Sequence, residues 1–376
     1  MNAILEKIFK LRRNTALNID CKNTNRYRIV IKEFDGSKTA YYFSTPIYNN
    51  NTGKTVDLTF HSIGEKASFA GSNSSISIYN GNLCMENAEG SCLISLNTRA
   101  RRVSEREVIC DNMRITPTTN GIALKIDCRR DACCTFMIET SKPFSEIRAN
   151  NKYFALMSEH FRPFMTVSCI GTLDSNENII SAANLTYQKV SDDKYSVTIS
   201  PCSKLGKAIL IEANLYEPKL FQDTTVESKN PKMNNAFGSV GFIGTTNECG
   251  EQWLYARPDL QKMAELNGKR ILRAILHVPK LNNSSVNLSI SKVMNRFCSF
   301  GSTWNNKVAQ TSQSWTSNIT DRYIDLDLTN LFSDIHGRLS QNEGFILKTQ
   351  KNGNGFSVIA TADNYLTPQI LEINYR

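Results

Sequence analysis

Two acidic residues near the C-terminal end have a spacing that could support chemistry. Asp325 and Asp327 alternate with Leu326 and Leu328, so a strand here would bury its leucines and present both carboxylates on the opposite face. Two carboxylates on one face could bind calcium or take part in acid–base catalysis. Because no partner residues accompany the pair, we expect a solvent-facing strand and no metal site, with calcium as the weaker alternative.

The three tryptophans could bind a sugar, because an indole ring stacks on the C–H face of a pyranose or fills a core. Trp253, in a predicted strand, and Trp315, in a predicted loop, are the better candidates for exposed aromatics. Trp304 is expected to be structural, with sugar stacking as the alternative. The candidate ligand-binding residues are Trp315, Trp253, Tyr255, Arg257 and Asn306.

The sequence gives little sign of catalysis. It lacks a Gly-x-Ser-x-Gly elbow, a Walker loop and a His-Glu-x-x-His motif. Cys133 and Cys134 follow Arg129, Arg130 and Asp131, and neighbouring cations can lower a thiol pKa. Adjacent strand residues point to opposite faces, so at most one of the two could lie in such a reactive site. A buried, structural cysteine is the favoured interpretation.

Metal and cofactor sites are not expected either. There is no Cys-x-x-Cys pair, and the four histidines are far apart in the sequence, which argues against a structural zinc site. The histidines are His61, His160, His277 and His336. We therefore expect no cofactor and no enzymatic activity.

The last two fifths of the chain carry a series of short phrases in a fixed order. The phrases lie at 223–226, from Asn230, at 242–244, 254–260, 302–306, 324–329, 343–348 and 368–375. Together they resemble the DNRLRE domain, a β-sandwich similar to carbohydrate-binding modules, over residues 221–376. The resemblance implies a surface that binds glycans, as in modules found on bacterial cell-surface proteins. Pro258 departs from the family pattern, which usually has an aromatic there, and indicates an edge or distorted strand.

Residues before this module have the alternation of short antiparallel strands separated by turn signals such as Asn80-Gly81. The predicted strands are 27–31, 40–43, 56–60, 76–79, 92–96, 113–115, 122–126, 134–138, 164–170, 184–190, 195–200 and 208–215. A short helix or turn is expected at 153–159, after a break at Lys142-Pro143.

These elements predict an all-β protein with two or three antiparallel β-sandwich domains and a short N-terminal amphipathic helix. The expected parts are a helix within 1–20, a sandwich or barrel at 21–141, a small β unit at 142–217 and the DNRLRE-like sandwich at 218–376. The small unit is either immunoglobulin-like or part of the first domain. The helix is expected to pack on the first domain, with a partner subunit or a lipid surface as alternatives.

No segment has the pattern of a signal peptide, and none approaches the ~18 apolar residues of a membrane span. The eleven cysteines show no recurring spacing, which argues against a disulfide framework. This cysteine usage favours synthesis in a reducing environment, with leaderless export or assembly into a particle as the alternatives. The localisation itself is left open. The formal net charge of +9 over 376 residues is mild, and its basic stretches lack the interleaved aromatics of a nucleic-acid platform.

Three functional hypotheses follow. The leading one is a non-catalytic structural or adhesive protein that presents rigid β-sandwiches to a glycan or a cell surface. The second is a self-assembling component of a larger particle, such as a phage tail or capsid accessory or a bacterial filament, in which neighbouring subunits of a homo-oligomer are the partners. The third is a polysaccharide-active enzyme that uses residues 21–216.

Overall fold

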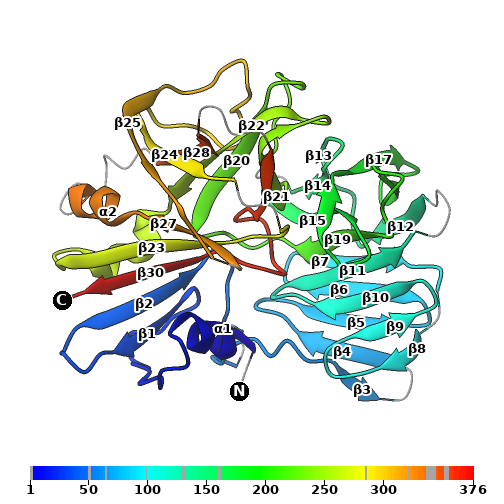
Figure 1. Cartoon of the computed structure of the whole chain (residues 1–376). Helices are drawn as coiled ribbons and strands as arrows, with labels where there is room; N and C mark the ends of the chain where they lie inside the picture. The colour runs from blue at the N-terminus through cyan, green and yellow to red at the C-terminus, as the bar shows by residue number, and fades with distance from the viewer. Residues whose placement is uncertain are drawn as a thin grey trace. The chain divides into compact units, whose positions relative to one another are not determined.

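The computed structural model describes residues 3–49, 52–63, 66–98, 100–128, 133–158, 162–283, 286–320, 322–335, 344–350 and 355–376. Nearly all regular structure in these residues is antiparallel strand, which confirms the all-β prediction (Figure 1). Some residues named above lie outside the described part, namely Arg129, Arg130, Asp131, Glu159, His160, His336 and Glu343.

The chain divides into two compact units that differ from the expected domains. The first unit contains Met1–Ile4 and Tyr48–Glu217, and the second contains Leu5–Ile47 and Pro218–Arg376. The expected seam at Glu217-Pro218 coincides with a boundary, but the seam near Ser141 does not. Strand β12 (Cys134–Thr140), before that seam, pairs with β18 (Lys194–Pro201), after it. Residues 142–217 thus complete the first sandwich, and residues 21–47 belong to the second unit instead.

The first unit consists of two described sheets. The eight-stranded sheet has the order β17 (Ala183–Lys189), β18, β12, β7 (Gly90–Ser95), β6 (Asn82–Asn87), β5 (Ser75–Tyr79), β4 (Lys66–Ala70) and β3 (His61–Ile63). The nine-stranded sheet has the order β13 (Glu146–Ala149), β14 (Tyr153–Met157), β15 (Pro163–Leu173), β19 (Ala208–Leu215), β11 (Gly121–Asp127), β10 (Met113–Pro117), β9 (Val108–Cys110) and β8 (Ala100–Val103), with β16 (Ile179–Ser181) paired to β15.

Both sheets contribute alternate apolar side chains to one core, in which Ile94 and Val197 meet Leu124 and Ile211. This is the arrangement of a β-sandwich. Two local expectations were wrong. The segment expected to be a short helix or turn is strand β14, because its five residues are all buried between neighbours. Residues 56–60 form no strand.

The turn predicted at Asn80-Gly81 is present between β5 and β6. Both residues have positive φ, 49° and 72°, as a two-residue hairpin turn requires. A Cβ on Gly81 would lie 2.3 Å from the carbonyl oxygen of Thr98, so only glycine fits here.

The second unit also has two described sheets. The six-stranded sheet has the order β1 (Arg28–Lys32), β2 (Lys38–Phe43), β30 (Ile370–Tyr375), β23 (Ile271–Pro279), β27 (Tyr323–Asp327) and β26 (Asn318–Ile319). The seven-stranded sheet has the order β25 (Gln310–Thr316), β24 (Leu288–Val293), β28 (Phe345–Thr349), β22 (Gly250–Pro258), β21 (Val240–Thr246) and β29 (Phe356–Ala360), with β20 (Phe221–Glu227) paired to β22. The short helices are η1 (Leu260–Leu266) and α2 (Thr329–Ile335).

The core of the second unit depends on residues from both ends of the chain. Ala40 pairs with Ile373 and Tyr42 with Leu371 across β2 and β30. These inward-facing side chains are buried together with Leu254 and Ile290 of the seven-stranded sheet. Residues 28–43 therefore supply the edge of a sandwich that otherwise begins at residue 218.

The predicted N-terminal helix is α1 (Ala3–Leu11), shorter than the expected span of 1–20. Its apolar face is buried, with Ile4 2% and Ile8 0% exposed. The helix ends because Arg13 and Asn14 adopt left-handed backbone conformations, and the Asn14 N–H bonds back to the carbonyl of Phe9 at 2.8 Å.

No helix in the described residues is both long enough and apolar enough to cross a membrane.

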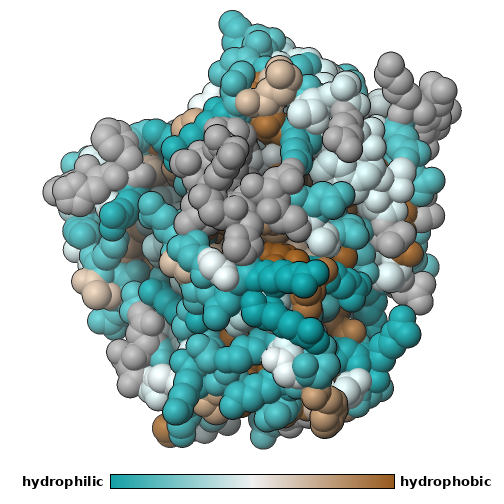
Figure 2. Space-filling view, turned by 90° about the vertical axis from the view of Figure 1, so that its left-hand side faces the viewer, coloured by the Kyte–Doolittle hydropathy of each residue, from teal (hydrophilic) through white to brown (hydrophobic). Residues whose placement is uncertain are grey.

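All eleven cysteines are described, and all are free thiols. Cys133 is exposed and Cys134 is half-buried, so the expectation of a buried cysteine is wrong for Cys133 and only partly met by Cys134. Burial raises the pKa of Cys134 to about 11. On the face drawn in Figure 2, hydrophilic residues predominate and hydrophobic residues show in small areas among them.

The division into units predicts how fragments behave. A fragment of residues 48–217 should fold alone, because it contains both of its sheets. A fragment of residues 218–376 should be destabilised by at least about 4 kcal/mol, since it lacks β1 and β2 and exposes apolar side chains that they cover. Thermal melts followed by circular dichroism measure this difference. Restoration of the missing stability by a synthetic peptide of residues 5–47 is the control, and an equally stable 218–376 fragment would contradict the division.

Candidate ligand-binding site

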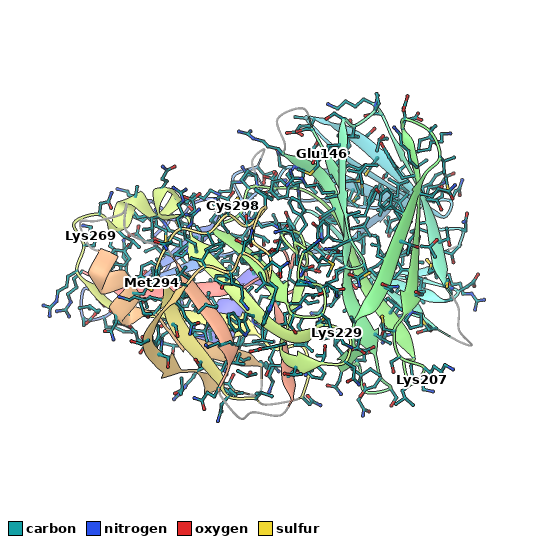
Figure 3. All side chains as sticks on the ribbon, turned by 90° about the horizontal axis from the view of Figure 1, so that it is seen from above. Glu146, Lys207, Lys229, Lys269, Met294 and Cys298 are labelled. Carbon is teal, nitrogen blue, oxygen red and sulfur yellow. The ribbon has the colours of Figure 1, made fainter. Side chains whose placement is uncertain are left out.

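A pocket of about 820 Å³ lies on the seven-stranded sheet of the second unit. Its size is within the range of small-ligand sites. The lining residues are Thr245, Glu251, Trp253, Ser289, Ser291, Gln310, Ser312, Ser314, Trp315, Thr316, Lys348, Thr349 and Gln350. Figure 3 labels Met294 and Cys298, which belong to the segment between β24 and β25, the strands that supply much of this lining.

Strand register explains why these side chains gather. Leu254 pairs with Leu347, so Trp253 and Lys348 are the next opposed residues of β22 and β28 and share the face turned away from the core. Lys348 in turn pairs with Ser289 of β24, and Ser289 pairs with Thr316 of β25. One row across four strands therefore carries an indole, an ammonium group and two hydroxyls.

The aromatic part of the site is built from two tryptophans and two lysines. The rings of Trp253 and Trp304 lie 5.0 Å apart at 54°. The Nζ atom of Lys307 lies 3.4 Å from the centre of the Trp304 ring and 4.7 Å from that of Trp253, and Lys348 Nζ lies 5.1 Å from Trp253. These are cation–π distances. Burial lowers the pKa of Lys307, and the Glu251 carboxylate partly opposes that change.

A polar turn fixes Trp304 in place. Asn306 Oδ1 accepts hydrogen bonds from the Thr303 N–H at 2.6 Å and the Thr303 hydroxyl at 3.0 Å, and its Nδ2 donates to the Gly301 carbonyl at 2.9 Å. Asn234 Nδ2 donates to the carbonyls of Ser299 and Ser302. Asn306, predicted to bind ligand, thus uses its amide to shape this turn.

Two polar atoms of the pocket residues are buried without a hydrogen-bond partner among the described residues. They are Ser291 Oγ and Gln310 Oε1. Buried polar groups in native proteins nearly always have a partner. Because neither atom is accessible to solvent, a ligand in the pocket would reach them only after neighbouring side chains moved.

Of the predicted site residues, Trp253 is the one whose ring fits the expected role. It is half-buried, and its Nε1 donates to Glu251 Oε1 at 2.7 Å. Trp315 also belongs to the pocket wall, but it lies in strand β25 and pairs with the buried Ile290. Its ring packs against the core and its Nε1 donates to the Asp327 carbonyl at 2.9 Å, so it is not free to stack on a sugar.

Tyr255 and Arg257 are placed differently from the prediction. Tyr255 is 1% exposed, donates its hydroxyl to the Val308 carbonyl at 3.1 Å, and has a pKa raised by burial. Arg257 is 8% exposed, donates to Gln222 and lies 5.8 Å above the Phe297 ring. Both side chains lie on the same face of β22 as Trp253. The segment between β24 and β25, however, covers that end of the strand.

Asp325 and Asp327 are engaged by protein groups. Asp325 Oδ1 lies 2.7 Å from His277 Nδ1, and Asp327 Oδ1 accepts the Thr329 N–H at 2.9 Å at the start of α2. His277 Nε2 also faces Glu372 at 3.4 Å. Among the described residues, no three His, Cys, Asp or Glu side chains are grouped to hold a metal ion. The weak calcium hypothesis therefore gains no support from the geometry.

Sequence reasoning missed most of the polar residues that surround Trp253. Lys348, Ser289, Ser291 and Gln310 lie on three strands that come together only through long-range pairing. The alternation of Glu251 and Trp253 within one strand was the one available signal for the outward face.

No family model matches this sequence, and no curated protein matches it at a significant level. The resemblance to the DNRLRE domain therefore stays a prediction.

The ion pairs of His277 predict a pH dependence of stability. Burial disfavours the imidazolium, but the hydrogen bonds that its ring N–H groups donate to Asp325 and Glu372 outweigh that penalty and raise the pKa of His277 from 6.5 to about 9. Because the pKa is raised on folding, the stabilisation is complete below pH 6.5 and is lost as the pH rises through 9. It amounts to about 3 kcal/mol.

Urea denaturation at several pH values tests this. His277→Gln should be less stable than the wild type at pH 6, and the difference should shrink above pH 9. The control is His61→Gln, on the exposed strand β3. A difference between His277→Gln and the wild type that does not change with pH would refute the assignment.

Proposed function

We propose that this is a non-catalytic adhesive or structural protein that binds a glycan through the pocket of the second unit. The observation that carries the proposal is the combination of a partly exposed indole, Trp253, with the ammonium group of Lys348 and the hydroxyls of Ser289 and Thr316 in one pocket. Sugars present both C–H faces, which pack on aromatic rings, and hydroxyl groups, which form hydrogen bonds with polar side chains of this kind.

The cations in the site favour a glycan that carries negative charge. Lys348 forms no ion pair with any described residue, and Lys307 lies over the same indole. Glu251, the carboxylate among the lining residues, already accepts the Trp253 N–H. A sugar carboxylate or sulfate would pair with Lys348.

The lining residues favour binding over hydrolysis. Most glycosidases place two carboxyl groups on either side of the scissile bond. Among the described residues that line this pocket, Glu251 is the single carboxylate. The expected resemblance to carbohydrate-binding-like modules points in the same direction.

A glycan array followed by calorimetry with the selected oligosaccharide tests the proposal. Trp253→Ala should weaken binding about tenfold or more, which corresponds to about 1.4 kcal/mol. Lys348→Gln should weaken it about fivefold and should reduce its dependence on salt, because a screened charge pair is lost.

Control variants separate binding from folding. Ser314→Arg, at an exposed position of the pocket, should block the site while leaving Trp253 and its packing intact. Lys269→Gln and Phe34→Ala, at a fully exposed turn, change residues that do not belong to the pocket lining given above, and both variants should bind normally. Absence of binding to any glycan, or binding that is indifferent to all three pocket variants, would refute the proposal and favour the alternative hypothesis of a particle component.

A further inference from the structure

A lysine and two aspartates are buried together elsewhere in the second unit. Lys219 precedes β20, Asp223 lies in β20, and Asp363 follows β29. The side chains of Lys219 and Asp363 are 6% and 8% exposed and form an ion pair. Asp223 is 3% exposed, and its Oδ2 accepts the N–H of Ala362, the neighbour of Asp363, at 2.6 Å.

The surroundings of the pair exclude water. Thr361, Ala362, Asn364 and Tyr365, which flank Asp363, are all at most 2% exposed. The Tyr365 ring lies 5.5 Å from Lys219 Nζ. Charges in such surroundings lose their hydration, so proton transfer from the ammonium group to a carboxylate, which gives a neutral pair, becomes accessible.

A neutral amine held against a carboxylic acid is a nucleophile held against an electrophile. Fixed proximity replaces a bimolecular encounter and supplies a large effective concentration. Amine nucleophiles of lysine react with carbonyl carbons once the amine is deprotonated.

We propose that Lys219 and Asp363 form an intramolecular amide bond. Lys219 Nζ attacks Asp363 Cγ, the new N–C bond forms, the bond from Cγ to one carboxyl oxygen breaks, and one water molecule leaves. Asp223 accepts a proton from the attacking nitrogen and delivers it to the departing hydroxyl. The overall change is amine plus carboxylic acid to amide plus water, with no oxidant or further reactant.

The position of Asp223 suits this proton transfer. Burial raises its pKa to about 6, against the opposing effects of the Ala362 N–H and of Lys219. A carboxyl group that exchanges its proton near neutral pH can both accept and donate.

The bond would join two segments that are distant in the sequence. Lys219 stands at the entry to β20, and Asp363 lies between β29 and β30. A covalent link there would close a long loop and stabilise the unit chiefly by restricting its unfolded state, as a disulfide does. The proposal is independent of glycan binding, although such a link would suit a protein that resists mechanical load.

The test is intact-mass spectrometry of the folded full-length chain with tryptic peptide mapping. The wild type should weigh about 18 Da less than its sequence requires. Trypsin should fail to cleave after Lys219, and a branched peptide should join the Lys219 and Asp363 segments. Asp363→Asn should lose ammonia instead of water and reach the same final mass as the linked wild type.

Two variants separate the bond from the ion pair. Lys219→Arg retains the charge pair but cannot form this amide, so it should show the unmodified mass and a melting temperature lower by about 10 °C. Asp223→Asn preserves the size of the side chain beside Ala362 but removes the carboxyl group that transfers the proton. This variant should therefore show the unmodified mass. A folded wild type of unmodified mass would overturn the proposal. So would a mass loss with only linear peptides, because a succinimide at Asp363-Asn364 would give that result.

Discussion

The second unit depends on the antiparallel pairing of β2 with β30, which joins the beginning of the chain to its end. Six residue pairs, from Lys38 with Tyr375 to Phe43 with Ile370, form this contact. It joins β1 and β2 to the other four strands of the six-stranded sheet and buries Ala40 and Tyr42 in the shared core. Apart from Met1–Ile4, the first unit is consequently an insertion, residues 48–217, between two parts of the second.

The closed core gives the seven-stranded sheet one buried face and one outward face. Leu254, Ile290 and Leu347 point inward, and their strand neighbours point outward. Four neighbouring strands each contribute one outward residue to the same row. This row therefore brings an indole, an ammonium group and two hydroxyls into a small area. The fixed register of a sheet then holds them in a constant geometry without a flexible loop.

Local patterns were enough for part of this structure. The alternation of apolar residues predicted the all-β class, Asn80-Gly81 predicted its turn, and Trp253 was placed correctly on an outward-facing position. The domain assignment of residues 21–47 was wrong, because it depends on pairing with β30 more than 300 positions later. Tyr255 and Arg257 lie on the same face of β22 as Trp253, yet the segment after β24 covers them, and the sequence of β22 contains no sign of that cover. Asn306 has a side chain suited to sugars, but its amide holds a turn.

The central claim is that a glycan binds beside Trp253 on the outer face of the seven-stranded sheet. Selective ¹⁵N labelling of tryptophan gives one indole N–H resonance for each of the three tryptophans in the chain. Titration with the selected oligosaccharide should shift the resonances of Trp253 and of its neighbour Trp304. The Trp315 resonance should stay nearly constant, because its N–H is bonded to the Asp327 carbonyl behind the sheet. A ligand that binds and moves only the Trp315 resonance, or none of the three, would contradict the account.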